Sequence, residues 1–116
     1  MKIYALTSDL MFGSQMSAAA RGSGAELTTL GSAAGLISSL EDAPAGCLVV
    51  LDMTCDAAKK DVAGLVTSLR ETHQSAQIVA FGPHVQEALL TAATQAGCDK
   101  VMSRGQFHRE MDQLFS

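Results

Sequence analysis

Short apolar runs alternate with longer amphipathic segments along the 116-residue chain. Runs of three to six residues rich in Val, Ile and Leu are typical of strands buried in a sheet. Segments whose apolar residues recur every three or four positions are typical of helices with one buried face. The pattern predicts strands at 2–6, 25–30, 47–51, 77–81 and 100–102, and helices at 10–21, 31–40, 59–73, 85–96 and 107–115.

The regular alternation of strand and helix predicts the fold class. Each connection between parallel strands is a right-handed crossover, so five strand–helix units give a parallel sheet with helices on both faces. A chain with five such units suits the flavodoxin-like strand order 2-1-3-4-5. We therefore expect one α/β domain over residues 1–116, a doubly wound five-stranded parallel sheet flanked by five helices. The residues expected to be buried at its centre are Val49, Val50, Leu51, Ile78, Val79 and Phe81.

The strand at 47–51 is uninterrupted by polar residues and stops at Asp52. Ligands and chemistry in open α/β sheets gather just beyond the carboxyl ends of the strands. The expected strand order brings Thr7-Ser8-Asp9, Asp52, Gly82 and Ser103-Arg104 to that one edge. Asp is also a common turn and cap residue, so its position alone leaves a purely structural role open.

The charge and the composition of the chain argue against several classes of binding partner. Eight Lys and Arg residues against twelve Asp and Glu give a net charge of −4, and no basic block occurs. The chain therefore lacks the electrostatic footprint of a nucleic-acid binder, and 4% aromatic residues provide no stacking platform. No apolar run approaches the roughly 20 residues that span a membrane. Three cysteines without a Cys-x-x-Cys pair, at Cys47, Cys55 and Cys98, favour free thiols in a reducing cytoplasm.

The common signatures of enzyme sites are missing as well. His73, His84 and His108 are too far apart in the sequence for a zinc motif. Gly22-Ser23-Gly24 precedes a strand, whereas a dinucleotide fingerprint follows one, and no phosphate loop or nucleophile elbow occurs. We therefore expect no enzymatic activity. His84 lies beside Pro83 near the predicted edge, where it is either functional or an ordinary loop residue.

Three segments give the whole chain a resemblance to the receiver domain of two-component response regulators. They are Leu51-Asp52-Met53 at the end of the third strand, Ala96-Gly97-Cys98-Asp99 before the fifth strand, and Ser103-Arg104 after it. The resemblance rests on order and position more than on identity. It implies that Asp52 occupies the phospho-acceptor position. It also implies that Ser103-Arg104 stands where the family has a Lys that contacts the phosphoryl group.

The chain departs from the receiver pattern at the positions that carry the chemistry. Receivers have an acidic pair after the first strand, whereas Thr7-Ser8-Asp9 offers one carboxylate. Receivers have a Thr or Ser after the fourth strand, whereas this chain has Gly82, and the usual Lys-Pro is Arg104-Gly105. Phosphoryl transfer needs Mg²⁺ and a cation to offset the developing charge. Asp9 and Asp52 would therefore form a weak Mg²⁺ site or none, and we expect no other cofactor.

Three interpretations remain open at this point. The chain is a degenerate receiver that signals through protein–protein contacts, a working receiver phosphorylated on Asp52, or a flavodoxin-like binder of flavin or another small ligand. Under the first, we expect Asp52 to form a standing ion pair with Arg104, a permanently charged partner suited to a carboxylate. The resemblance implies a partner surface on helix 85–96, strand 100–102 and helix 107–115, and a homodimer is compatible with it. The residues expected near this surface are His84, Glu87, Arg104 and Gln106.

Overall fold

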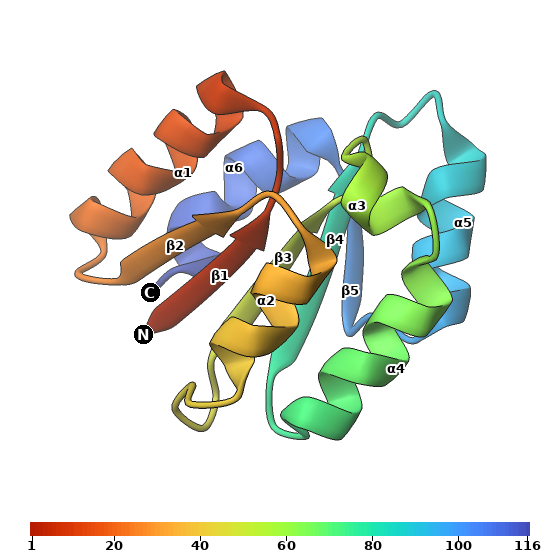
Figure 1. The fold of residues 1–116 in the computed structure, drawn as a ribbon. Helices are drawn as coiled ribbons and strands as arrows, with labels where there is room; N and C mark the ends of the chain where they lie inside the picture. The colour runs from red at the N-terminus through yellow and green to blue at the C-terminus, as the bar shows by residue number, and fades with distance from the viewer.

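A computed structural model describes residues 1–116 as a five-stranded sheet with six helices (Figure 1). The strands are β1 (Lys2–Leu6), β2 (Glu26–Leu30), β3 (Leu48–Asp52), β4 (Gln77–Gly82) and β5 (Lys100–Ser103). The helices are α1 (Leu10–Gly22), α2 (Ala33–Leu40), α3 (Asp56–Lys59), α4 (Val62–Thr72), α5 (Glu87–Ala96) and α6 (Arg104–Leu114).

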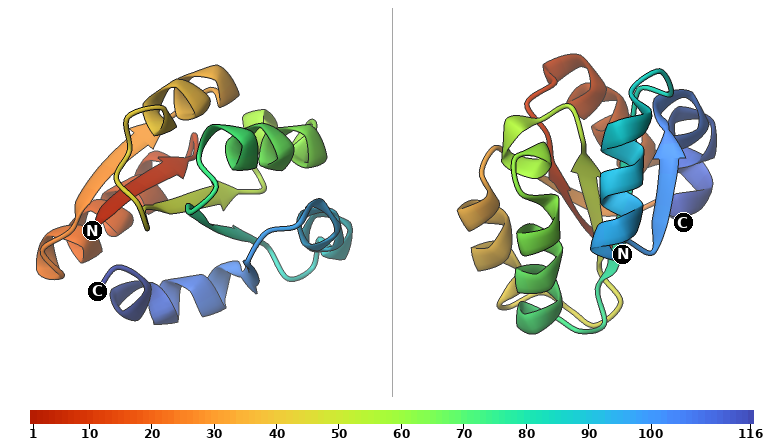
Figure 2. Two further views of the ribbon diagram at one scale, coloured as in Figure 1. Left: turned by 90° about the horizontal axis from the view of Figure 1, so that it is seen from below. Right: turned by 90° about the vertical axis from the view of Figure 1, so that its right-hand side faces the viewer.

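The strand order is β2-β1-β3-β4-β5, and every neighbouring pair is parallel. This confirms the predicted doubly wound topology. Helices α1 and α6 cover one face of the sheet, while α2, α4 and α5 cover the other (Figures 1 and 2). The carboxyl ends of all five strands consequently point to the same edge of the molecule, where the loops into the helices begin.

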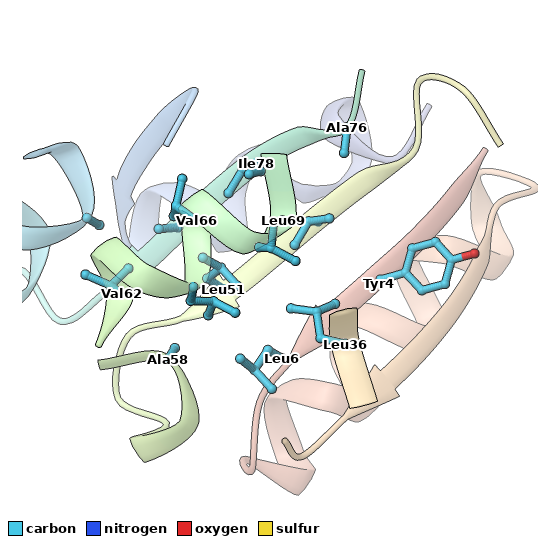
Figure 3. Close-up of a cluster of buried hydrophobic side chains, with 14 of the residues drawn as sticks. Tyr4, Leu6, Leu36, Leu51, Ala58, Val62, Val66, Leu69, Ala76 and Ile78 are labelled. Atoms are coloured by element: carbon cyan, nitrogen blue, oxygen red, sulfur yellow. The ribbon is translucent and has the colours of Figure 1, made fainter. Parts of the chain in front are cut away.

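The core lies on both faces of the sheet, and β3 is buried along its whole length. The six residues predicted to be buried are each at most 1% exposed, which confirms that prediction. Figure 3 shows the larger cluster, in which side chains such as Leu36, Leu51 and Leu69 meet between the sheet and its helices. Burying one such side chain contributes about 1.5–3 kcal/mol. The second cluster lies under α1 and α6 and contains stacked rings, with the Phe81 and Phe107 centroids 4.5 Å apart.

Two helices begin three residues away from their predicted starts, and N-cap side chains explain both. Ser103 accepts a hydrogen bond from Gln106 N at 3.1 Å, so α6 begins at Arg104 and not at Phe107. Asp61 accepts one from Gly64 N at 3.1 Å and begins α4 at Val62. The short α3 lies in a stretch predicted to be mainly loop, which raises the number of helices from five to six. No helix combines the length and the apolarity needed to cross a membrane.

Candidate functional site

The candidate site is the edge formed by the carboxyl ends of β1, β3, β4 and β5. Asp52 is the last residue of β3, and β4 ends beside it, with Phe81 in register with Asp52. Gly82 is in register with Ser103 at the end of β5. Thr7 follows β1 directly. The parallel topology therefore places these residues at one edge, as the strand order predicts.

Asp52 is held by hydroxyl groups and is only 1% exposed. The Thr7 hydroxyl donates to Asp52 Oδ2 at 2.7 Å. The Thr54 hydroxyl donates to Oδ1 at 2.7 Å, and the Thr54 backbone N–H donates to the same oxygen at 3.0 Å. Burial of a carboxylate is unfavourable unless its oxygens are hydrogen-bonded, and here both oxygens have donors. We refer to Thr7, Asp52 and Thr54 together as the hydroxyl clamp.

Thr7 is itself fixed in place. Its side chain is buried, and its backbone N–H donates to Leu30 O at 3.1 Å. The Thr7 hydroxyl oxygen accepts from Asp9 N at 3.1 Å, which leaves its proton directed at Asp52. This hydroxyl therefore occupies the side of Asp52 that faces the β1–α1 loop.

Arg104 does not pair with Asp52, so that prediction is wrong. Its guanidinium binds Asp9 Oδ2, and Arg104 Cζ lies 4.8 Å from the centre of the Phe12 ring, a cation–π contact. The reason is the early start of α6, because the first residue of α6 lies beside the first turn of α1, which packs against it. The nearest carboxylate there is Asp9, while the oxygens of Asp52 are taken by threonines.

Both carboxylate oxygens of Asp9 already have partners within the fold. Oδ1 accepts from Phe12 N at 2.9 Å and so caps α1, and Oδ2 binds Arg104. The Phe12 hydrogen bond, followed by that from Arg104, lowers the pKa of Asp9 below its usual range. Mg²⁺ prefers one or two carboxylates together with water and substrate oxygens. Asp9 and Asp52 do not fit such a site, because each oxygen already has a donor that a cation would have to displace.

The other candidate site residues, Gly82, Ser103 and His84, make no side-chain hydrogen bond to Asp52. Gly82 is buried and carries no hydroxyl, and a Cβ built there would lie 3.4 Å from both Leu90 and Met53, in van der Waals contact with each. The Ser103 hydroxyl is used as the cap of α6. His84 is exposed in the loop after β4 and makes no side-chain hydrogen bond. The site is therefore the hydroxyl clamp with a separate Asp9–Arg104 pair beside it.

No protein-family model and no curated protein sequence matches this chain. Solved structures match it closely in fold. TadZ from Pseudomonas aeruginosa, a CheY-like protein, is 20% identical with a TM-score of 0.75, over 99% of this chain and 90% of that one. The receiver domain of the sensor histidine kinase PA1611 from the same organism, with magnesium coordinated in its cleft, is 14% identical with a TM-score of 0.77. That match covers 98% of this chain and 93% of the receiver domain.

A third match places the fold inside a longer protein. NtrX from Brucella abortus, solved in complex with ATP, is 16% identical with a TM-score of 0.78, over 97% of this chain and 25% of NtrX. The chain thus spans about a quarter of the length of NtrX. At these identities the likeness concerns the fold. The chain has the CheY-like, flavodoxin-like fold that receiver-domain structures share.

Proposed function

We propose that this chain is an atypical receiver-like signalling module that acts through protein–protein contacts, with little or no phosphorylation of Asp52. The observation that carries the proposal is the hydroxyl clamp. A receiver-type fold keeps an aspartate at the end of its central strand, yet both oxygens of that aspartate are occupied by Thr7 and Thr54.

The chemistry of phosphoryl transfer supports this proposal. A carboxylate nucleophile must direct a free oxygen at phosphorus, while a metal ion and a cation offset the charge on the transferred group. Asp52 is buried and its oxygens already accept three hydrogen bonds. The nearby cation, Arg104, is bound to Asp9. Acceptance of a phosphoryl group would require the clamp and the ion pair to open together.

Treatment with acetyl phosphate and Mg²⁺, followed by intact-mass spectrometry, tests the proposal. We expect the wild-type chain to gain no more acid-labile phosphate than Asp52→Ala, because the clamp and the absent metal site both oppose transfer. The PA1611 receiver domain, which holds magnesium in its cleft, serves as the positive control. An acid-labile gain of one phosphate that disappears in Asp52→Ala would establish the alternative, a working phospho-accepting receiver.

The partner surface that we propose is the face made by α5, β5 and α6. A shallow hollow on this face is lined by residues such as Leu90, Thr91, Val101 and Ser103, which combine apolar and hydroxyl groups. Exposed Glu87 and His84 lie at its end near the candidate site, where the first turn of α6 carries Arg104 and Gln106. The proposal carries over to this chain the use that the receiver resemblance implies for this face.

Site-specific photo-crosslinking tests this surface. A crosslinking residue in place of exposed Thr91 on α5 is expected to give several-fold more protein adducts in cells than one in place of exposed Thr67 on α4. The yield from Thr91 should not change with phosphodonor, because the module is constitutive. Equal yields from the two positions, or a yield from Thr91 that depends on phosphodonor, would contradict the proposal.

A further inference from the structure

Strand β2 lies at one end of the sheet and pairs with β1 on one side only (Figure 1). Successive residues of a strand in a parallel ladder direct their backbone groups to alternate sides. Glu26 N donates to Met1 O at 2.9 Å, and Leu30 O accepts from Thr7 N at 3.1 Å. Glu26, Thr28 and Leu30 therefore face β1. Leu27 and Thr29 direct their N–H and C=O groups away from the sheet, where no strand lies.

This edge lacks the features by which proteins usually protect an open strand. Such features are lysines, prolines, bulges or a covering segment. The sequence of β2 is Glu-Leu-Thr-Thr-Leu, and its one charged residue, Glu26, is paired with Lys2 at 2.9 Å. Thr28 and Thr29 are exposed. The opposite edge strand, β5, instead begins with the exposed Lys100.

The elements beside β2 leave room for another strand. On one face, the stretch from Leu27 to Leu40, which includes α2, contains no charged residue. On the other face, a polar hollow between α1 and β2 is lined by small residues, among them Gly13, Ser14, Ser17 and Thr29. Leu10 and Arg21 also border that hollow, and its charged residues, Asp9 and Arg21, have opposite signs. Neither face therefore presents a set of like charges that would keep a second copy of the chain away.

We propose that two copies of this chain associate through their β2 edges, antiparallel and about a two-fold axis at Thr28, to form a continuous ten-stranded sheet. Leu27 of each copy then pairs with the partner's Thr29, exchanging two hydrogen bonds, and the symmetric pair supplies two more. All outward N–H and C=O groups of both strands are satisfied in this single register, because positions 27 and 29 lie symmetrically about 28.

The same symmetry favours a second copy over an unrelated strand. Closed two-fold dimers use one self-complementary patch on both subunits. Thr28 faces the partner's Thr28 at a position without backbone hydrogen bonds, where cross-strand side chains are closest and Thr–Thr pairs are favourable. Glu26 lies opposite the partner's Leu30, so no like charges meet. The α5–β5–α6 face lies at the other end of the sheet and stays free, so this inference is independent of the proposed function.

A cysteine at the two-fold axis gives a direct test. Opposed residues of this kind have Cα atoms about 4.5 Å apart, within the roughly 4.4–6.8 Å range of disulfides. Thr28→Cys is expected to form a covalent dimer under mild oxidation at least ten times faster than Thr67→Cys, an exposed threonine on α4. The native thiols interfere little, because Cys47 and Cys55 are buried and burial raises the pKa of Cys98 to about 11. Equal rates for the two variants would overturn the proposal.

Sedimentation velocity and hydrogen exchange on chains without added cysteines supply the second measurement. The wild type is expected to reach twice its 12.1 kDa mass as the protein concentration rises. Thr28→Lys should stay monomeric, because a dimer would place two ammonium groups opposite each other. The control Thr67→Lys should dimerise like the wild type. The Leu27 and Thr29 amides should exchange more slowly in the dimer, while the Thr28 amide is protected at all concentrations. A wild type that stays monomeric, or a dimer unaffected by Thr28→Lys, would overturn the proposal.

Discussion

Replacing Asp52 with alanine is expected to lower the free energy of unfolding by about 3 kcal/mol, measured by urea denaturation. The change removes an acceptor of three hydrogen bonds and leaves the buried Thr7 hydroxyl without a partner for its proton. Hydrogen bonds to charged groups contribute about 1.5–3 kcal/mol each, and the regained desolvation energy of the carboxylate offsets part of the loss.

The sign of this effect distinguishes the hydroxyl clamp from an acidic pocket. An aspartate crowded by other carboxylates is destabilising, so its removal would raise stability. Asp52→Asn should cost less, about 1 kcal/mol, because its amide keeps one acceptor and can donate to a reoriented hydroxyl. Asp42→Ala, at an exposed position without an ion pair, should stay within about 0.5 kcal/mol of the wild type. An Asp52→Ala variant as stable as the wild type would show that the clamp contributes nothing.

The fold could be predicted from the sequence because its signals are local and repeated. Apolar runs located all five strands to within one residue at each end, and crossover geometry restricted the strand order. Helix starts were less predictable. The Ser103 and Asp61 caps decide where α6 and α4 begin, and many Ser and Asp residues could have served as caps.

The sequence predicted which residues lie at this edge of the sheet, but not which side chains contact one another there. Strand order brought Asp52 and Arg104 to one edge, but the side-chain pairing depends on the direction in which each element leaves that edge. Arg104 stands in the first turn of α6 against the capped end of α1, and this decides its choice of Asp9. No sequence pattern carries that information, because it arises from the packing of two helices whose paired residues, Asp9 and Arg104, are 95 positions apart in the chain.

The two threonines of the clamp differ in how well their contacts with Asp52 could be predicted from the sequence. Asp-x-Thr is a local pattern, since an aspartate commonly accepts from the backbone N–H two residues on, and Asp52 does so with Thr54. The contact with Thr7 joins residues 45 positions apart and follows only from the pairing of β1 with β3. The sequence shows that a hydroxyl replaces an acid after β1. It does not predict that this hydroxyl binds Asp52.

Replacing Thr7 with aspartate is expected to lower the free energy of unfolding by about 3 kcal/mol at neutral pH without Mg²⁺, because it sets a second carboxylate beside a buried one. Repulsion raises the pKa of the carboxyl pair in the folded state above that in the unfolded state. The folded chain then binds more protons, so the loss should shrink as the pH is lowered from neutral.

Mg²⁺ gives the same variant a second readout. Two adjacent carboxylates provide the ligands that Asp9 and Asp52 together do not, so Mg²⁺ should raise the melting temperature of Thr7→Asp and leave the wild type unchanged. Saturation at one hundred times the dissociation constant corresponds to about 2.7 kcal/mol, enough to recover most of the loss. Thr67→Asp, an exposed substitution on α4, should show neither the loss nor the recovery. A Thr7→Asp chain as stable as the wild type and indifferent to Mg²⁺ would place Thr7 away from Asp52 and remove the basis of the clamp. Recovery in Mg²⁺ would show that the position after β1 faces Asp52 closely enough for two carboxylates to share a metal ion.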